Sequence, residues 1–243
     1  MKKRTLLMSA MLTGAMTIPL GRDYASNNHK IETDNSRIIV EKALTPLEML
    51  VLEYDSATIN DVLDRKKSHD EEQAEIILDQ IDIYTPLITK NVMKGIFWQE
   101  SLFNPYAISR TGCKGVGQLS KGAWKTFGKG PHEKAYDRQA NIIAAVKVAL
   151  FIEKYVKKNH PRIDTLTKDQ TLEYIYAGYN WGPGRLKQYN WDISKMRKET
   201  REYVPKVKEN VKRYEFEQKV IDAYYYKQDF EMIGPQKPTP III

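Results

Sequence analysis

The sequence has few of the residues that build disulfides and metal sites. Cys113 is the only cysteine among 243 residues, so no disulfide can form within the chain. The four histidines show no metal-ligand spacing, and the sequence has neither an H-E-x-x-H motif nor a paired-cysteine motif. We therefore expect no metal and no cofactor. No His/Asp arrangement flanks Cys113, which we interpret as a buried structural thiol.

The sequence also lacks internal repeats and any concentrated run of one charge. Its 38 basic and 31 acidic residues give a net charge of +7 and a pI of about 9.2, which indicates an anionic partner. Lysines are interspersed with acids, which is typical of a solvated surface. We therefore expect no nucleic-acid binding, and a cell-wall polymer or a membrane surface remains as the partner.

No apolar run reaches the roughly 20 residues that a membrane span needs. The longest run, residues 5–20, contains a glycine and a proline and follows three basic residues at positions 2–4. This is the pattern of an export signal. The cleavage site before position 26 is poor, so an uncleaved anchor is the alternative. We assign residues 1–25 to this signal or anchor and expect an exported protein of the periplasm or cell envelope.

The rest of the chain is divided by composition and by helix signals into three parts. Residues 26–67 are predicted to be a polar linker followed by an N-terminal helical extension. Residues 68–210 form the main domain, and residues 211–243 form a C-terminal helix with a loose tail. One main domain with an extension is also what the chain length favours.

Capping signals predict where the first helices begin. A capping box at residues 45–48 opens a helix to about Tyr54. Ser68 opens a second helix, and Thr85, followed by Pro86, is predicted to cap a third. The second helix is expected to carry three isoleucines toward the core: Ile76, Ile77 and Ile81.

The later part of the chain is also predicted to be helical. Asp137 caps a helix to about Lys157, and further helices are expected over 170–181 and from 198 to 229. Only residues 106–119 look β-like. The predicted fold is therefore mainly α, a helical bundle with a small β-hairpin region.

Glu100 breaks the apolar pattern of the third predicted helix. At about 100° per residue it lies on the same face as Met93, Ile96 and Phe97. Apolar neighbours and the negative end of the helix dipole both raise the pKa of a carboxyl group. Local rules are usually broken at functional sites, and an acid with a raised pKa can donate a proton at neutral pH. The structural alternative is a helix-end glutamate that faces solvent or pairs with a lysine.

Three ordered motifs around this glutamate resemble those of one enzyme family. They are Glu100 and Ser101 with Asn104, Pro105, Ala107, Ser109, Gly112, Gly115, Gln118 and Leu119; then Tyr179 and Asn180 with 182–184; and last Glu199, Thr200, Arg201, Tyr203 and Val204. Asp137 and Asn141 match a D-x-x-x-N helix start between the first two motifs. Together they cover about half of the chain. The sequence resembles the soluble lytic transglycosylases, peptidoglycan-cleaving enzymes similar to goose lysozyme.

The resemblance implies a lysozyme-like α+β fold around a catalytic helix, and it implies a reaction. Glu100 would act as acid and then base while the muramyl C6 hydroxyl attacks the anomeric carbon, leaving a 1,6-anhydro sugar. Gln118, Tyr179 and Asn180 would line the substrate cleft, and Glu199 would reach it. Peptidoglycan glycan strands would be the substrate, with a secretion, conjugation or phage assembly as a candidate partner.

Each of these residues also has a structural interpretation. Gln118 could cap a turn, Tyr179 could be a core aromatic residue, and Asn180 could bond the glycine turn at 182–184. Glu199 and Arg201 are expected to form a structural pair that holds the last helix.

The sequence departs from the family pattern at several of these positions. Gly117 replaces a methionine, Ser120 and Lys121 replace Met-Pro, and Trp124 and Trp181 replace alanines. We expect Gly117 to widen the cleft locally, Trp124 to fill core volume, and Trp181 to offer a stacking surface or to fill the core as well. Two other functions stay open: a hydrolase of the same fold, and an inactive wall-binding or assembly module.

Overall fold

A computed structural model describes the backbone of residues 32–34, 37–39 and 44–233 and the side chains of residues 44–226. The chain divides into two compact units, Met1–Ala43 and Leu44–Ile243. In the first unit, β1 (Glu32–Asp34) and β2 (Arg37–Ile39) form an antiparallel pair in which Thr33 lies opposite Ile38. The sequence predicted a linker at these positions. The predicted export signal lies outside the described residues.

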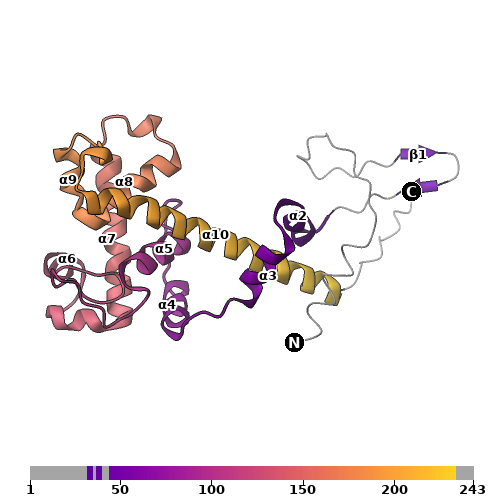
Figure 1. Cartoon of the computed structure of the whole chain (residues 1–243), viewed down its shortest axis with the longest axis horizontal. Coiled ribbons are helices and arrows are strands. Elements are labelled where there is room, and N and C mark those ends of the chain that lie inside the picture. Colours follow the sequence, from indigo (N-terminus) through magenta and orange to yellow (C-terminus); the bar gives the residue numbers. More distant parts are fainter. Residues whose placement is uncertain (1–31, 35–36, 40–43, 234–243) are drawn as a thin grey trace. The chain divides into compact units, whose positions relative to one another are not determined.

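The second unit is built from helices, which confirms the mainly α prediction (Figure 1). The elements are α2 (Pro46–Glu53), α3 (Ser56–Asp64), α4 (His69–Asp79), α5 (Lys90–Ser101), α6 (Lys121–Phe127), η1 (His132–Tyr136), α7 (Arg138–Asn159), η2 (Ile163–Thr165), α8 (Lys168–Trp181), α9 (Pro183–Gln188), η3 (Ile193–Lys195) and α10 (Lys198–Ile233). No helix among the described residues has the length and apolar character to cross a membrane.

The long helix α10 connects the parts of this unit. It packs against α5 and α8 and also against α2 and α3, so residues 44–67 cover part of α10 (Figure 1). Glycine makes the closest of these contacts possible. A Cβ atom at Gly95 of α5 would lie 2.4 Å from the Val211 side chain of α10, a distance at which atoms overlap. The close approach brings the last turn of α5 beside the start of α10.

Several predicted capping residues are confirmed. Thr45 forms a capping box with Glu48, Ser68 caps α4 and Asp137 caps α7. The predicted core face of α7 is buried: Ile142, Ala145, Ala149, Ile152 and Val156. Two short helices that we did not predict, α3 and α6, also begin at side-chain caps, Asp55 and Ser120.

The predicted start of α5 was wrong by one turn. The helix begins at Lys90, with Thr89 as its N-cap. The Thr85 N–H donates to the carbonyl of Ile88, and the Thr85 hydroxyl accepts from the Ile88 N–H, so residues 85–88 form a separate turn. Thr85 and Thr89 can both cap a helix. Thr85 caps the separate turn, and Thr89 caps α5.

The core-facing residues of α4 were also partly mispredicted. Ile76 is exposed, and Ile77 and Ile81 are partly buried, while Ala74 and Leu78 are fully buried with Glu71. Glu71 can be buried because both of its carboxylate oxygens accept hydrogen bonds from Arg65, at 3.1 and 2.8 Å. The buried face of α4 is therefore the one that carries Glu71, Ala74 and Leu78, and the Arg65 hydrogen bonds allow an acid on it.

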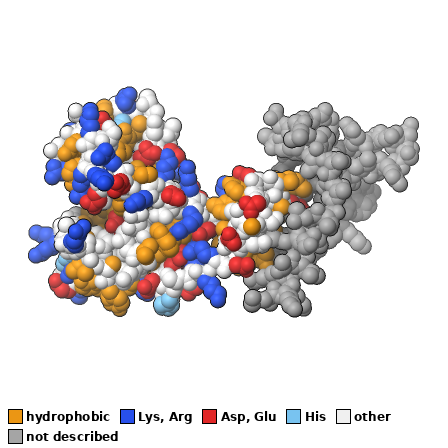
Figure 2. Space-filling view, viewed as in Figure 1, with side chains coloured by type: hydrophobic (Ala, Val, Ile, Leu, Met, Phe, Trp, Pro, Cys, Tyr) orange, Lys and Arg blue, Asp and Glu red, His pale blue; other side chains and the backbone are white. Residues whose placement is uncertain are grey.

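The predicted β-hairpin region contains pairing but no regular strand. Residues 106–119 form two isolated antiparallel bridges, Ile108 with Lys114 and Lys114 with Leu119. The segment is a chain of tight turns, and Gly112 and Gly115 adopt positive φ angles of 81° and 77°. On the face of the second unit shown in Figure 2, basic and acidic side chains are interspersed.

Candidate active site

Glu100 lies in the last turn of α5, where α10 crosses it. Its carboxyl group is partly buried, and the hydroxyl of Tyr203 from α10 donates to Glu100 Oε1 at 2.6 Å. Burial raises the pKa of Glu100 to about 7; the Tyr203 hydrogen bond opposes this shift, and the negative charge of Glu199 adds to it. A carboxyl group with this pKa is about half protonated at neutral pH, so it can both donate and accept a proton.

Tyr203 had no predicted role at the site. The residue is buried, and burial raises the pKa of its own hydroxyl well above the usual value. Tyr203 therefore stays protonated and acts as a hydrogen-bond donor to the Glu100 carboxylate. Its place in the third motif was the only sequence signal for such a role. A buried tyrosine also needs a hydrogen-bond partner for its hydroxyl group, and here that partner is Glu100.

The loop after α5 turns the chain away from Glu100 with two residues in the left-handed region. Leu102 and Phe103 have φ angles of 53° and 65°. Phe103 is fully buried, with its ring 6.4 Å from that of Phe97 and 6.3 Å from that of Tyr214. The Ser101 hydroxyl donates to the carbonyl of Val116 at 2.7 Å. These contacts join the end of α5 to the turns of 106–119.

Asn141 is the polar centre that holds those turns. It is fully buried in α7, and its Oδ1 accepts from the Gly117 N–H at 2.7 Å. Its Nδ2 donates to the carbonyls of Lys114 and Ala135 at 3.0 and 2.8 Å. Gly115 passes so close that a Cβ atom there would lie 2.3 Å from Asn141 Nδ2. The D-x-x-x-N motif therefore combines a helix cap at Asp137 with a loop anchor one turn later.

Tyr179 and Gln118 both bond to this loop. The Tyr179 hydroxyl donates to the carbonyl of Gly117 at 2.9 Å. Burial raises the pKa of Tyr179, and so does the charge of Glu100, which places the two side chains in one electrostatic environment. Gln118 has a φ of 47°, and its Nε2 donates to the carbonyls of Ala107 and Gly115. The amide nitrogen of Gln118 thus caps the turn, as in its structural interpretation.

The structure shows no widening at Gly117. A Cβ atom there would lie 2.6 Å from the Ala145 Cβ and 2.9 Å from the Tyr179 hydroxyl. The space that a methionine would need is filled by these two residues, so the predicted local widening of the cleft is wrong. Gly117 instead allows the Tyr179 hydrogen bond.

Asn180 and Glu199 meet where α8 ends and α10 begins. Asn180 Oδ1 accepts from the Thr200 hydroxyl at 2.7 Å and from Arg197 at 3.3 Å, and its Nδ2 lies 3.5 Å from Glu199. Asn180 therefore joins two helices, and the predicted bond to the glycine turn is replaced by bonds to α10. The predicted pairing of Glu199 with Arg201 is also wrong, because Glu199 pairs with Arg197 at 3.4 Å.

The two tryptophans have different surroundings. Trp124 is buried, and its Nε1 donates to the carbonyls of Gly130 and Pro131, which confirms its place in the core. Trp181 is partly buried, and the guanidinium groups of Arg185 and Arg197 lie 5.3 and 5.1 Å from its ring. Cations thus contact the ring that we expected to offer a stacking surface.

Cys113 lies in the same loop and is partly buried, less than predicted. Its sulfur lies 3.7 Å from the Thr111 hydroxyl. Within the ranges that the structure describes, no three His, Cys, Asp or Glu side chains are grouped so as to hold a metal ion.

The family model described as Transglycosylase SLT domain matches residues 82–204, which include Glu100, Tyr179 and Tyr203. Membrane-bound lytic murein transglycosylase F of Desulfosudis oleivorans is 28% identical over 144 residues, which are 55% of this chain and 28% of that protein. The chain therefore spans little more than a quarter of this curated relative.

Among solved structures, an inactive mutant of the lytic transglycosylase Slt from Pseudomonas aeruginosa aligns with a TM-score of 0.43 and 17% identity. The alignment covers 70% of this chain and 26% of that one. The family assignment depends instead on the match to residues 82–204, which is half of the sequence and contains all three motifs. The chain belongs to the transglycosylase SLT domain family.

Proposed function

We propose that this protein is a lytic transglycosylase that cleaves the β-1,4 bond between N-acetylmuramic acid and N-acetylglucosamine in peptidoglycan. The observation that carries the proposal is the partly buried carboxyl group of Glu100, held by Tyr203 and with a pKa raised to about 7. Family membership supports the same reaction class. The name of the curated relative supports a location in the cell envelope.

The proposed reaction uses Glu100 twice. Protonated Glu100 donates its proton to the glycosidic oxygen as the bond to the anomeric carbon breaks. The C6 hydroxyl of the same muramyl residue attacks that carbon and gives its proton to the Glu100 carboxylate. The product carries a 1,6-anhydro ring, and Glu100 returns to its protonated form. The nucleophile lies within the substrate, so no second carboxylate has to activate water.

We assign substrate contacts to Gln118, Tyr179, Asn180 and Glu199. The structure limits what each can offer. Gln118 Nε2 is engaged by two backbone carbonyls, so a sugar would be bound through its amide oxygen. The Tyr179 hydroxyl donates to Gly117 and can accept from a sugar hydroxyl. Asn180 bonds to Arg197 and Thr200, and Glu199 pairs with Arg197. These contacts favour a role for both residues in shaping the side of the substrate cleft.

We further propose that residues 68–210 form the catalytic domain, that residues 1–25 direct export or anchor the chain, and that 211–243 form a C-terminal extension. The contacts of α2 and α3 with α10 make residues 44–67 a cover for that extension. A secretion, conjugation or phage assembly that must open the wall is the proposed partner.

The product identifies the reaction. Purified protein should release muropeptides with 1,6-anhydro ends from sacculi, as measured by mass spectrometry. Hydrated, reducing ends would instead show a hydrolase, for which Glu199 is the candidate second carboxylate because its charge already acts on Glu100. Binding to sacculi without any cleavage would show an inactive wall-binding module.

Replacing Tyr203 by phenylalanine should change the pH dependence of cleavage. The Tyr203 hydrogen bond lowers the pKa of Glu100, so Tyr203→Phe raises that pKa further and moves the alkaline limb of the rate profile to higher pH. Cleavage at pH 7 should fall about ten-fold, because the carboxyl group loses its orientation. The measurement is the pH profile of muropeptide release. Tyr106→Phe, at an exposed tyrosine, is the control. An unshifted alkaline limb in Tyr203→Phe would contradict this role.

A further inference from the structure

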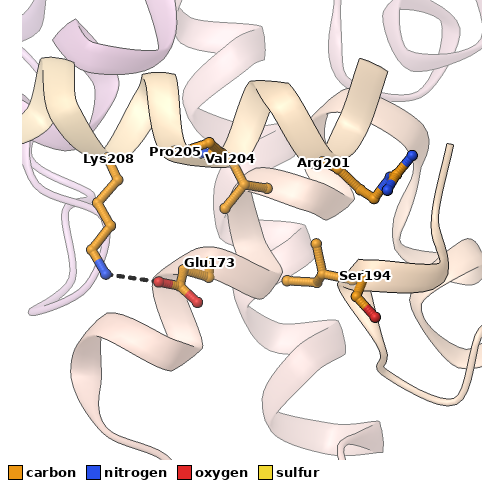
Figure 3. A pocket seen from close by; sticks show the side chains of 7 residues that line it. Glu173, Ser194, Arg201, Val204, Pro205 and Lys208 are labelled. Carbon is orange, nitrogen blue, oxygen red and sulfur yellow. Dashed lines mark hydrogen bonds and ion pairs between the residues drawn. The ribbon is translucent and has the colours of Figure 1, made fainter. Parts of the chain in front are cut away.

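A pocket with a volume of about 600 Å³ lies on α10 (Figure 3). The residues that line it come from α8, η3 and α10: Glu173, Ile193, Ser194, Arg201, Val204, Pro205 and Lys208. This volume falls within the range of known small-ligand sites, roughly 300–1,000 Å³. Neither Glu100 and Tyr203 nor the proposed substrate-contact residues line this pocket.

The pocket opens on a different side of α10 from the catalytic carboxyl group. Tyr203 points to Glu100, whereas the α10 residues of the pocket are at positions 201, 204, 205 and 208. At about 100° per residue, these four positions lie about 100–200° around the helix from Tyr203. A ligand in this pocket would therefore be separated from Glu100 by α10 itself.

The charges of the pocket leave one cation without a partner. Lys208 Nζ lies 2.7 Å from Glu173 Oε1 and 3.4 Å from Asp169 Oδ2, so its charge is compensated (Figure 3). Arg201 is exposed and forms no ion pair or side-chain hydrogen bond with another residue in the described part of the chain. Its guanidinium group presents several N–H donors, which suit a carboxylate.

The remaining walls of the pocket are apolar or weakly polar. Ile193, Val204 and Pro205 supply aliphatic surface beside Arg201. Pro205 has no N–H group, so it cannot donate the usual helical hydrogen bond to the carbonyl of Arg201. No aromatic ring is among the lining residues, so the pocket lacks the flat surface on which sugars stack.

We propose that this pocket binds the carboxyl-terminal end of a short peptide with small apolar side chains. Arg201 pairs with the terminal carboxylate, and the aliphatic wall contacts the side chain next to it. This inference rests on the proposed function for the source of the peptide: in peptidoglycan, the stem peptides that end in D-alanine have this chemistry. The pocket would hold the stem peptide of a neighbouring strand while Glu100 acts on another.

Peptide binding by the full chain tests the proposal without any catalytic step. The probe is an N-acetylated tripeptide ending in D-alanyl-D-alanine, titrated by calorimetry against its C-terminal amide. The acid should bind, and the amide should bind about ten-fold more weakly or not at all. Arg201→Gln should weaken binding of the acid roughly 10- to 100-fold, because a charge-assisted contact is lost.

Two further variants separate the pocket from the general charge of α10. Lys206→Gln removes an exposed cation of the same helix outside the pocket and should leave binding unchanged. Ile193→Ser reduces the apolar wall and should weaken binding of the acid and of any residual amide alike. Equal binding of acid and amide, or equal losses in Arg201→Gln and Lys206→Gln, would overturn the proposal.

The proposed function and this inference can fail separately. Anhydro-muropeptide release with no binding of the D-alanyl peptide would overturn the pocket assignment alone. Peptide binding with no release from sacculi would overturn the catalytic proposal alone. An acidic L-peptide of equal length that binds as well as the D-alanyl peptide would show a site for the C-terminal end of a protein. That result would overturn the assignment of the pocket to the stem peptide of peptidoglycan.

Discussion

Glu100→Gln should abolish muropeptide release while leaving the fold intact. Glutamine keeps the size of the side chain and can still bond to Tyr203, but it cannot deliver a proton to the glycosidic oxygen. General acid–base catalysis contributes about 10²–10⁴-fold, and one residue here serves both proton transfers, so the loss should be at the upper end of that range. Binding to sacculi should survive, since the change removes no substrate contact other than the acid itself.

The same substitution should stabilise the protein at alkaline pH. The pKa of Glu100 is raised on folding, so its protonated form favours the folded state at pH values below the unfolded pKa of about 4.5. That contribution is lost as the pH rises through about 7. Glutamine is neutral throughout, so Glu100→Gln should gain on the order of 2 kcal/mol relative to wild type between pH 5 and pH 8.

Muropeptide release, a sacculus pull-down and thermal melts at pH 5 and pH 8 measure these effects. Glu202→Gln is the matched control, because Glu202 is exposed on α10 and pairs only with Lys198 at 3.7 Å among its described neighbours. It should change neither cleavage nor the pH dependence of melting. Cleavage by Glu100→Gln within a few-fold of wild type would show that another group is the acid.

The sequence was sufficient to predict much of the helical framework, and it singles out Glu100 as an acid on an apolar helix face. An acid on an apolar stripe stands out within a single helix, and caps such as Thr45 and Asp137 depend on neighbours three residues away. The start of α5 was mispredicted because Thr85 and Thr89 have the same local chemistry. The Thr85 hydroxyl also donates to Glu153 of α7, 68 residues away, a contact that local sequence patterns do not predict.

Local sequence patterns do not predict which residues contact the site residues. Tyr203 is 103 residues from Glu100 and reaches it because Gly95 lets α5 and α10 approach closely. Glu199 and Arg201 are two residues apart, so they lie about 200° apart around α10 and cannot share a face. The predicted ion pair between Glu199 and Arg201 is not compatible with this separation. Arg201 instead lines the pocket on α10.

Asn141→Ala should strongly destabilise the site framework. Asn141 is fully buried and bonds to three backbone groups: the N–H of Gly117 and the carbonyls of Lys114 and Ala135. Alanine would leave the Gly117 N–H and the Ala135 carbonyl without this partner, and each unsatisfied buried group costs about 1–3 kcal/mol. The Lys114 carbonyl would lose one of two donors, because it also accepts from the Leu119 N–H. The loop can relax in part, so we expect a total loss of about 3–5 kcal/mol of unfolding free energy.

Two other substitutions show whether the amide itself is responsible. Asn141→Asp keeps the acceptor for Gly117 but places a carboxylate against two carbonyls, so it should be at least as destabilising as alanine. Asn159→Ala, at the end of the same helix, removes only one bond, from Nδ2 to the carbonyl of Tyr155, and should cost about 1 kcal/mol or less. Denaturant unfolding measures all three variants. An Asn141→Ala variant as stable as Asn159→Ala would mean that the loop around Gln118 and Gly117 does not depend on this anchor.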